Sequence, residues 1–207
     1  MGRRSGSSQR WLERQRGDSY VARSREAGYR SRAAFKLIEI DQQQRILRPG
    51  LRCVDLGASP GGWSQIAAKR VGAGGSVFAL DILPMEPIPG VHFIQGDFTE
   101  NEPLAALRSA LRDGPVDLVM SDMAPNISGN RAVDQPRAMY LAELALDLAV
   151  QVLKPGGDLL VKLFQGDGFD DFRQQTQEKF ANLKFTKPPA SRSKSREMYL
   201  LARNLRI

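Results

Sequence analysis

Two side chains that could take up or release a proton occupy strand-like stretches of the sequence. Asp122 follows the apolar run 116–121 and precedes a Met-Ala-Pro turn, so it lies at the end of a predicted strand. Lys162 lies inside the apolar run 157–164. Burying a lysine is unfavourable unless its ammonium is paired or its proton is lost. The positions of Asp122 and Lys162 therefore favour a role in proton transfer. The alternative is that the aliphatic part of Lys162 packs in the core while its ammonium reaches solvent.

A glycine-rich turn lies between a predicted strand and a predicted helix at residues 54–64, VDLGASPGGWS. Glycines let a backbone approach a ligand closely, and N–H groups at a helix start can bind oxygen atoms. The turn lacks the Lys-Ser/Thr pair of a phosphate-binding loop and the G-x-G-x-x-G spacing of a dinucleotide site. Carboxylates follow three predicted strands, at Asp55, Asp81 and Asp97. They suit a ligand with a ribose, an exocyclic amine and a positive charge, and S-adenosylmethionine has all three.

If the ligand is S-adenosylmethionine, the residues after Asp122 also indicate which kind of atom accepts its methyl group. Methyltransferases that act on exocyclic amino groups typically carry Asp/Asn-Pro-Pro-aromatic here, whereas this chain has Asp-Met-Ala-Pro. An oxygen acceptor is therefore favoured. Lys36, at the border of an apolar helix stripe, and Glu197, at the start of the last predicted strand, could join Asp122 and Lys162. Each of these two residues alone would be interpreted as a surface charge.

The surrounding sequence predicts the elements that must position these residues. We expect strands at 52–56, 76–81, 91–95, 116–121, 157–164, 183–187 and 197–203, and helices at 31–47, 61–71, 101–112, 136–153 and 168–180. This alternation predicts an α/β fold with a mostly parallel seven-stranded sheet, helices on both faces and ligands at the carboxyl ends of the strands. The last two strands follow one another without a helix, so they should form an antiparallel hairpin.

Positive charge is concentrated in two segments. Residues 1–32 contain nine Arg and three acidic residues, and residues 184–196 contain five basic residues and no acid, in a chain of net charge +7. Two basic segments beside an otherwise acidic domain suggest a polyanionic partner. The alternative is a solvated tail and hairpin. The Ser-, Gly- and Arg-rich residues 1–28 are predicted to form a flexible tail, followed by a single domain at 29–207.

The other residue types favour a cytoplasmic monomer without a metal site. The lone cysteine, Cys53, lies in a predicted strand, which excludes an internal disulfide and indicates a buried structural thiol in a reducing compartment. The single histidine, His92, starts a predicted strand and is expected to be structural. No apolar run approaches the roughly 18 residues of a membrane span. The Arg-rich, acid-poor start can also be interpreted as an organelle transit peptide.

Five motifs occur in the order that is typical of one enzyme family: SRAAFKL at 31–37, DLGASPGGW at 55–63, SDMAP at 121–125, VK at 161–162 and SRE at 195–197. On these motifs the chain resembles, over residues 29–199, the RrmJ/FtsJ family of S-adenosylmethionine-dependent ribose 2′-O-methyltransferases. Bacterial members include an enzyme that methylates a uridine of large-subunit ribosomal RNA. The resemblance implies a Rossmann-like methyltransferase fold and a reaction without a metal.

The resemblance also implies roles for individual residues. The family's Lys-Asp-Lys-Glu tetrad maps onto Lys36, Asp122, Lys162 and Glu197, with Lys162 as the proton acceptor. The family's cofactor residues map onto Gly61, Trp63, Asp81, Asp97 and Asp122, and the same site is expected to include Asp55, Gly57, Ser59 and Pro60. RNA phosphates are expected to bind Arg32, Lys184, Lys187, Arg192, Lys194 and Arg196.

The expected reaction is 2′-O-methylation of a uridine in large-subunit ribosomal RNA, on the assembled or late-assembling subunit. The tetrad does not encode the RNA, so a transfer-RNA ribose methyltransferase of the same family stays open. An RNA-binding ribosome-assembly protein without catalytic activity stays open as well. A nicotinamide-dependent oxidoreductase is disfavoured by the glycine spacing of residues 57–62.

Overall fold

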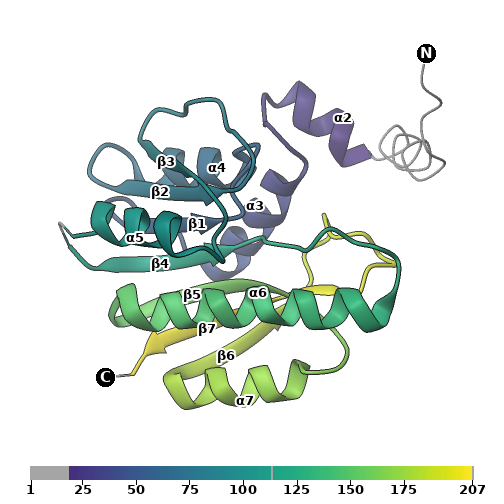
Figure 1. Ribbon diagram of the computed structural model, residues 1–207. Helices are drawn as coiled ribbons and strands as arrows, with labels where there is room; N and C mark the ends of the chain where they lie inside the picture. Colours follow the sequence, from purple (N-terminus) through teal and green to yellow (C-terminus); the bar gives the residue numbers. More distant parts are fainter. Residues whose placement is uncertain (1–18, 113, 207) are drawn as a thin grey trace.

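The computed structural model describes residues 19–112 and 114–206, which form a seven-stranded sheet flanked by helices (Figure 1). Along the chain the strands are β1 (Arg52–Leu56), β2 (Ser76–Asp81), β3 (Val91–Gln95), β4 (Val116–Ser121), β5 (Leu153–Phe164), β6 (Phe180–Thr186) and β7 (Glu197–Leu205). Their order in the sheet is β3-β2-β1-β4-β5-β7-β6. Strands β1 to β5 pair in parallel, whereas β7 is antiparallel to β5 and to β6. The predicted mostly parallel α/β sheet with an antiparallel last strand is confirmed.

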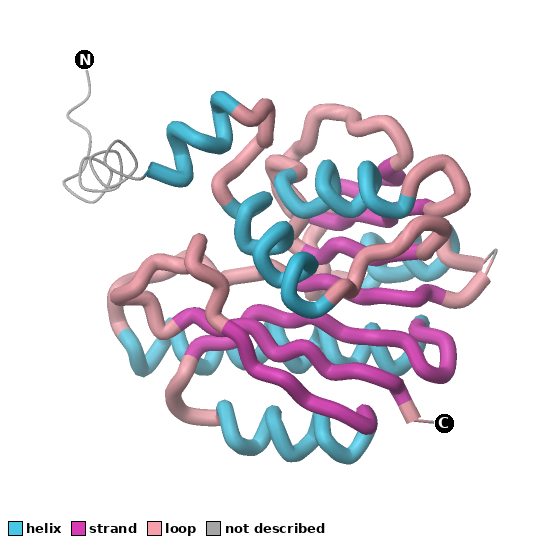
Figure 2. Tube along the Cα trace, turned by 180° about the vertical axis from the view of Figure 1, so that it is seen from behind, coloured by secondary structure: helices cyan, strands magenta, loops and turns pink. Residues whose placement is uncertain are grey.

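Helices cover both faces of this sheet. They are α2 (Ser19–Glu26), α3 (Ala33–Gln44), α4 (Gly62–Val71), α5 (Asn101–Ala110), α6 (Arg131–Val152) and α7 (Phe169–Lys179). Helices α5, α6 and α7 pack on one face (Figure 1). Helices α3 and α4 cover the other face, and α2 packs against α3 (Figure 2).

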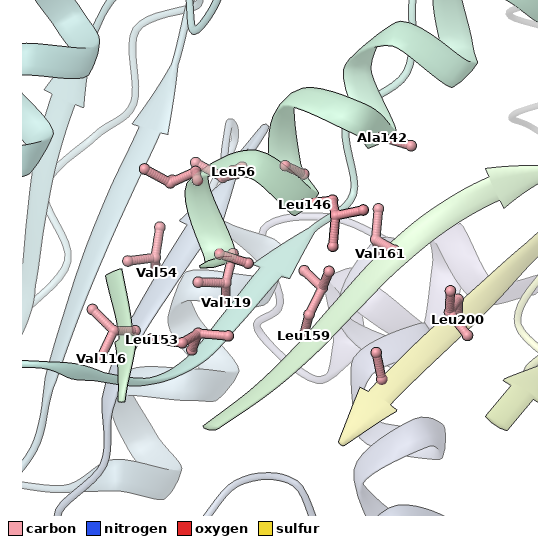
Figure 3. Close-up of a cluster of buried hydrophobic side chains, with 14 of the residues drawn as sticks. Val54, Leu56, Val116, Val119, Ala142, Leu146, Leu153, Leu159, Val161 and Leu200 are labelled. Atoms are coloured by element: carbon pink, nitrogen blue, oxygen red, sulfur yellow. The ribbon is translucent and has the colours of Figure 1, made fainter. Parts of the chain in front are cut away.

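Alternate strand residues enter the cores on the two faces, because successive side chains of a strand point in opposite directions. In β4, Val119 belongs to the core under α5, α6 and α7, whereas Leu118 and Met120 belong to the core under α3 and α4. Figure 3 shows part of the first core, with Leu146 of α6 beside Leu159 of β5. Burying each such aliphatic side chain contributes about 1.5–3 kcal/mol, so both faces hold their helices in place.

The antiparallel register between β5 and β7 determines which side chains lie on the α3 side of the sheet. Lys162 is directly opposite Tyr199, and Phe164 is directly opposite Glu197. Tyr199 belongs to the core under α3 and α4, and Lys162, its direct partner, shares that face. Glu197 precedes Tyr199 by two residues and therefore points to the same side. The register thus gathers these side chains beneath α3.

Strands β1 to β4 fall at their predicted residues, whereas several later boundaries differ. Helix α6 begins at Arg131 rather than at residue 136, because the Asn130 side chain caps it by accepting a hydrogen bond from the Ala132 N–H at 3.1 Å. Strand β5 begins at Leu153 rather than at residue 157, because the predicted turn is an irregularity in the β4–β5 pairing and does not end the strand. Strand β6 begins at Phe180 rather than at residue 183.

Helix α2 was not predicted, because residues 19–26 contain no continuous apolar stripe. Its side chains hold it on α3: the Tyr20 ring meets the Phe35 ring edge-on at 5.4 Å, and the Arg23 guanidinium lies 4.8 Å from the centre of the Phe35 ring. Such contacts depend on the surface of another helix. The rest of the predicted flexible tail up to residue 18 lies outside the described residues.

Candidate active site

The four tetrad residues and one further residue form a connected polar cluster where β4, β5 and β7 meet α3. Lys162 Nζ lies 3.0 Å from Asp122 Oδ1 and also donates to the Asp122 carbonyl oxygen. The same Oδ1 accepts a hydrogen bond from the Tyr199 hydroxyl at 2.7 Å. Lys36 Nζ lies 3.1 Å from that hydroxyl and 2.6 Å from Glu197 Oε1. The structure therefore brings Lys36, Asp122, Lys162 and Glu197 together through Tyr199.

Each cluster residue comes from an element that the sheet fixes in place. Asp122 directly follows β4, and its N–H donates to the Leu56 carbonyl at 3.1 Å, which ties this strand end to β1. Lys162 lies two residues before the end of β5 and is only 8% exposed. Lys36 lies in the first turn of α3 and reaches the cluster because α3 crosses the same face of the sheet. Residues far apart in sequence are thus held within hydrogen-bond distance.

Tyr199 was not among the predicted site residues, although its hydroxyl contacts Asp122, Lys36 and Glu197. Its side chain is completely buried, and its ring packs against the Trp63 ring with centroids 5.6 Å apart. Burial and the two neighbouring carboxylates raise the pKa of Tyr199 well above its ordinary value, so the hydroxyl stays protonated. Its position two residues after Glu197, on the same face of one strand, is the signal that could have revealed it.

The charges around Asp122 keep its carboxyl ionised. Burial alone would raise the pKa of Asp122, but the ammonium groups of Lys162 and Lys36 and the Tyr199 hydrogen bond outweigh burial and lower this pKa. A carboxylate that stays charged can orient a lysine on one side and attract a positively charged ligand on the other.

A pocket of about 420 Å³ lies at the carboxyl ends of β1 to β4. Four predicted cofactor residues, Gly57, Asp81, Asp97 and Asp122, line it. Asp122 therefore belongs both to this pocket and to the polar cluster. Open α/β sheets bind their ligands in the crevice outside the carboxyl ends of the strands, so the pocket is the expected ligand site.

The loop after β1 approaches the pocket wall closely at Gly57. The φ angle of Gly57 is +75°, and a Cβ at this position would lie 2.8 Å from the Met123 side chain. A larger residue would therefore combine an unfavourable backbone conformation with a steric clash. Glycine at this position keeps the loop and the segment after β4 close enough to form one wall.

Backbone and neighbouring polar groups hold two of the three carboxylates of the pocket, Asp81 and Asp97. Asp81 Oδ2 accepts from the Ser59 N–H at 2.8 Å, and Asp81 Oδ1 accepts from the Leu83 N–H at 2.8 Å. Asp97 Oδ1 accepts from both the N–H and the hydroxyl of Thr99, and these hydrogen bonds lower the pKa of Asp97. Both carboxylates are thus oriented by the loops that surround them.

Asp55 is completely buried at the end of β1, next to the glycine-rich loop. Its Oδ2 accepts a hydrogen bond from Ser64 Oγ at 2.6 Å, whereas Oδ1 has no hydrogen-bond partner among the described residues. Burial, opposed by the Ser64 bond and assisted by Asp122 and Asp81, raises the pKa of Asp55 to about 7. Asp55 is not among the residues that line the pocket, although it was predicted to bind the cofactor.

Four other predicted cofactor residues, Ser59, Pro60, Gly61 and Trp63, are also absent from the lining of this pocket. The Trp63 indole N–H donates to the Ala33 carbonyl at 2.9 Å, inside the core beneath α3. Gly61 has a φ of +105° and lies against Arg30, whose guanidinium also contacts the Pro60 carbonyl at 3.4 Å. Trp63, Gly61 and Pro60 shape the loop rather than the pocket lining.

Most of the predicted RNA-binding residues lie in the β6–β7 loop, residues 187–196. Lys187, Arg192 and Lys194 are exposed there, and the Arg196 guanidinium donates to the Gln165 carbonyl at 2.9 Å. Arg32, at the start of α3, donates to the Ala190 carbonyl and so lies against this loop. Lys184 lies further back, exposed on the edge strand β6. The loop leads directly into Glu197 of the cluster.

The single histidine and the single cysteine of the chain lie among the described residues. Within residues 19–112 and 114–206, no group of three or more His, Cys, Asp or Glu could hold a metal ion. His92 stacks on Phe78 with ring centroids 5.1 Å apart. Cys53 is buried, as predicted, and burial raises the pKa of its thiol to about 12. Across the same residues, no helix has both the length and the apolar composition that crossing a membrane requires.

Comparison with known proteins identifies the family. Residues 29–205 match the FtsJ-like methyltransferase family. The chain belongs to this family. The match covers α3 to β7, including the pocket and every residue of the cluster, whereas α2 precedes it.

Relatives of this FtsJ-like methyltransferase share nearly its full length. The ribosomal RNA large subunit methyltransferase E of Alkalilimnicola ehrlichii is 63% identical over 205 residues, which are 98% of each chain. The protein of the same name from Pseudomonas aeruginosa is 58% identical over 203 residues, again 98% of each chain. The crystal structure of a ribosomal RNA methyltransferase from Plasmodium falciparum matches with a TM-score of 0.78 at 31% identity, covering 86% of this chain and 98% of that chain.

Proposed function

We propose that this FtsJ-like methyltransferase transfers a methyl group from S-adenosylmethionine to the ribose 2′-hydroxyl of a uridine in large-subunit ribosomal RNA. The substrate is the assembled or late-assembling subunit. The observation that carries the proposal is the pairing of Lys162 with Asp122, because it joins a lysine that can handle a proton to a carboxylate that also lines the ligand pocket. The names of the relatives at 58% and 63% identity support large-subunit ribosomal RNA as the substrate.

The residues of the pocket fit S-adenosylmethionine. A volume of about 420 Å³ lies in the range of small-molecule sites. Asp81 and Asp97 would hold hydroxyl and amino groups, and Asp122 would attract the positive charge. When bound, the cofactor supplies a methyl group on a positively charged sulfur.

The cluster can position an acceptor hydroxyl and take its proton. A general base must lie within hydrogen-bond reach of the proton that it removes. Asp122, which lines the pocket, holds Lys162 Nζ at 3.0 Å. After its ammonium has released a proton to solvent, the neutral Lys162 Nζ would accept the proton of the ribose hydroxyl as the oxygen takes the methyl group. Lys36 and Glu197 would orient the ribose, and the Tyr199 hydroxyl links Lys36 to the Asp122 carboxylate that holds Lys162.

Basic residues around the cluster would bind the RNA backbone. Arg32 contacts the loop that carries Lys187, Arg192, Lys194 and Arg196 and leads into Glu197, so these residues would contact phosphates near the target nucleotide. Affinity should then fall steeply with rising salt, because phosphate contacts release counterions. The 2′-hydroxyl, which DNA lacks, would restrict the reaction to RNA.

Transfer of labelled methyl from S-adenosylmethionine to large-subunit RNA, intact large subunits and transfer RNA tests the proposal. We expect label at one uridine ribose of the large-subunit RNA, with the stronger signal in intact subunits, as mapped by mass spectrometry of nuclease digests. Label in transfer RNA alone would show that the protein is instead a transfer-RNA ribose methyltransferase of the same family. A wild-type protein that labels none of these RNAs but supports subunit assembly would be an assembly protein without catalysis.

A further inference from the structure

One carboxylate of α3, that of Glu39, connects helix α2 with the β6–β7 loop. Glu39 Oε1 accepts a hydrogen bond from the Tyr20 hydroxyl of α2 at 3.1 Å. Glu39 Oε2 accepts from the Ala190 N–H at 2.7 Å. Arg32 donates to the carbonyl of the same Ala190. Both backbone polar groups of this buried loop residue are therefore held by residues at or in α3.

The spacing along α3 places this connection beside the polar cluster. Arg32, Lys36 and Glu39 are separated by four and three residues, so they lie on one stripe of the helix. The outer two residues hold Ala190, and the middle one, Lys36, contacts Glu197 at 2.6 Å. The docking of the loop and the pairing of the cluster thus share one helix face.

Ser191, the next residue of the loop, carries this docking into the cluster. Its hydroxyl donates to Glu197 Oε1 at 2.9 Å, which is the oxygen that Lys36 contacts. Ser191 is 6% exposed and therefore packed in place, whereas Arg192 is exposed. A displacement of Ala190 would move Ser191 and change the hydrogen bonds that orient Glu197.

We propose that Glu39 is a positioning residue that docks both α2 and the β6–β7 loop on α3 and thereby fixes Glu197 against Lys36. This inference rests on the proposed function. It adds a route by which RNA binding can affect the orientation of the cluster residues. Basic residues lie at both ends of the connection, Arg23 and Arg25 in α2, and Arg192 and Lys194 in the loop. RNA bound across both ends is thereby coupled to Glu197 through Glu39.

Substitutions of Glu39 separate its two hydrogen bonds from its charge. Glu39→Ala removes both acceptors, and we expect kcat for methyl transfer to fall by about tenfold, the effect of losing a charge-assisted hydrogen bond. Glu39→Gln keeps an acceptor for the Ala190 N–H and a donor for the Tyr20 hydroxyl, so we expect it to restore most of kcat. Tyr20→Phe removes the α2 contact alone, and its effect should be smaller than that of Glu39→Ala.

Hydrogen exchange gives a readout that does not depend on activity. In Glu39→Ala the amides of Ala190 and Ser191 should exchange faster, whereas the amides of β1 and β4 should exchange at wild-type rates. The affinity for S-adenosylmethionine should also be unchanged, because Glu39 does not line the cofactor pocket. Glu178→Ala, on the exposed face of α7, is the matched control and should leave both measurements unchanged.

A double-mutant cycle decides whether Glu39 acts through the loop. If it does, Ser191→Ala should add little to the kcat loss of Glu39→Ala. The inference would be overturned if the kcat losses of the two variants add, or if Glu39→Ala has a wild-type kcat. Either result would leave the proposed function intact, provided that wild-type protein methylates ribosomal RNA. Wild-type protein that methylates no RNA would instead refute the proposed function, and the exchange of Ala190 would still test the docking itself.

Discussion

The pocket and the polar cluster share Asp122 but are built in different ways. The residues that line the pocket fall between 57 and 126, apart from Leu141, and mostly backbone groups of the surrounding loops hold its half-buried carboxylates Asp81 and Asp97. The cluster draws on residues 36–199, is mostly buried, and consists of side chains that hydrogen-bond to one another. The shape of the pocket therefore depends mainly on the backbone of its loops. The cluster depends on charged side chains that come from distant parts of the sequence.

This difference determines how each region should respond to change. In the cluster, removal of one partner leaves a buried charge or hydroxyl without compensation, which is strongly unfavourable. In the pocket, most hydrogen bonds to the carboxylates come from the backbone or from adjacent residues, so a single side-chain change leaves the neighbours in place. Chemistry should therefore fail in cluster variants that still bind cofactor, and binding should fail in pocket variants whose cluster is intact.

Lys162→Ala should have the largest effect. Without the proposed proton acceptor we expect methyl transfer to fall by about a thousandfold, within the range for a general base. Cofactor affinity, measured by calorimetry, should stay within about threefold of wild type, because Lys162 does not line the pocket. Lys154→Ala is the control: Lys154 lies near the opposite end of the same strand and is also paired, with Asp117 at 2.5 Å. Wild-type transfer rates in Lys162→Ala would exclude it as the base.

Gly57→Ala should have the second-largest effect, and it should change the pocket rather than the cluster. The added Cβ would lie 2.8 Å from Met123 at a φ of +75°. Left-handed strain alone should lower the free energy of unfolding by about 1–2 kcal/mol. We expect cofactor affinity to fall as well, by about tenfold, because relief of the clash displaces the pocket wall that Gly57 and Met123 form. Gly156→Ala separates the two causes, because Gly156 has a φ of +78° but no atom within 4 Å of the position that an added methyl group would occupy. Equal destabilisation of the two variants in thermal unfolding would show that crowding at Met123 is unimportant.

Tyr199→Phe should lower kcat by about tenfold without changing cofactor affinity. The lost hydroxyl leaves Asp122 and Lys36 without their shared partner, and we also expect a loss of about 1–3 kcal/mol in the free energy of unfolding. Steady-state kinetics and urea unfolding measure the two effects. Tyr140→Phe, half-exposed on α6, serves as the control. Unchanged kcat would show that the four charged residues hold their geometry without Tyr199.

Asp55→Asn should have the smallest effect on methyl transfer, because Asp55 belongs neither to the cluster nor to the pocket lining, whereas its effect on stability should depend on pH. The folded-state pKa of Asp55, about 7, lies above its ordinary value of 3.8, so the folded protein keeps a proton that the unfolded chain has lost. Wild-type stability should therefore fall as pH rises from about 4 to 7, by at most about 1.4 kcal/mol per pH unit, and then level off. The asparagine variant does not titrate at this position, so its advantage in unfolding free energy should grow over the same window.

Urea unfolding at pH 5, 6, 7 and 8, without cofactor, measures this advantage. Asp171→Asn, which changes an exposed carboxyl of α7, is the control for general effects of charge removal. A constant difference between Asp55→Asn and wild type across the series would mean that Asp55 is already ionised at pH 5.

Local features of the molecule were largely predictable from the sequence. Strands β1 to β4 fall at their expected residues, because each is a short apolar run bounded by Gly, Pro or Asp. The pocket was located from Gly57 and the strand-end carboxylates, since parallel strands bring their carboxyl ends together. The tetrad came from resemblance to a family, and its residues do meet in the structure, while their catalytic roles stay predictions.

Features that depend on contacts between distant elements were not predictable. Helix α2 is held by Tyr20 and Arg23 on Phe35, and no periodicity within residues 19–26 encodes that surface. Tyr199 looks like an ordinary strand aromatic until the β5–β7 register sets it opposite Lys162. The predicted start of β5 is too late, because glycine and proline in residues 154–157 indicate a turn and not an irregular strand.

Strand β7 lies between β5 and β6, although both precede it in the chain. Before β7 inserts, β5 and β6 each expose an unpaired edge of the kind that promotes aggregation. The same insertion delivers Glu197 and Tyr199 to Lys162. Closure of the sheet and assembly of the polar cluster are therefore one folding event, so recovery of methyl transfer after dilution from denaturant should report when β7 docks.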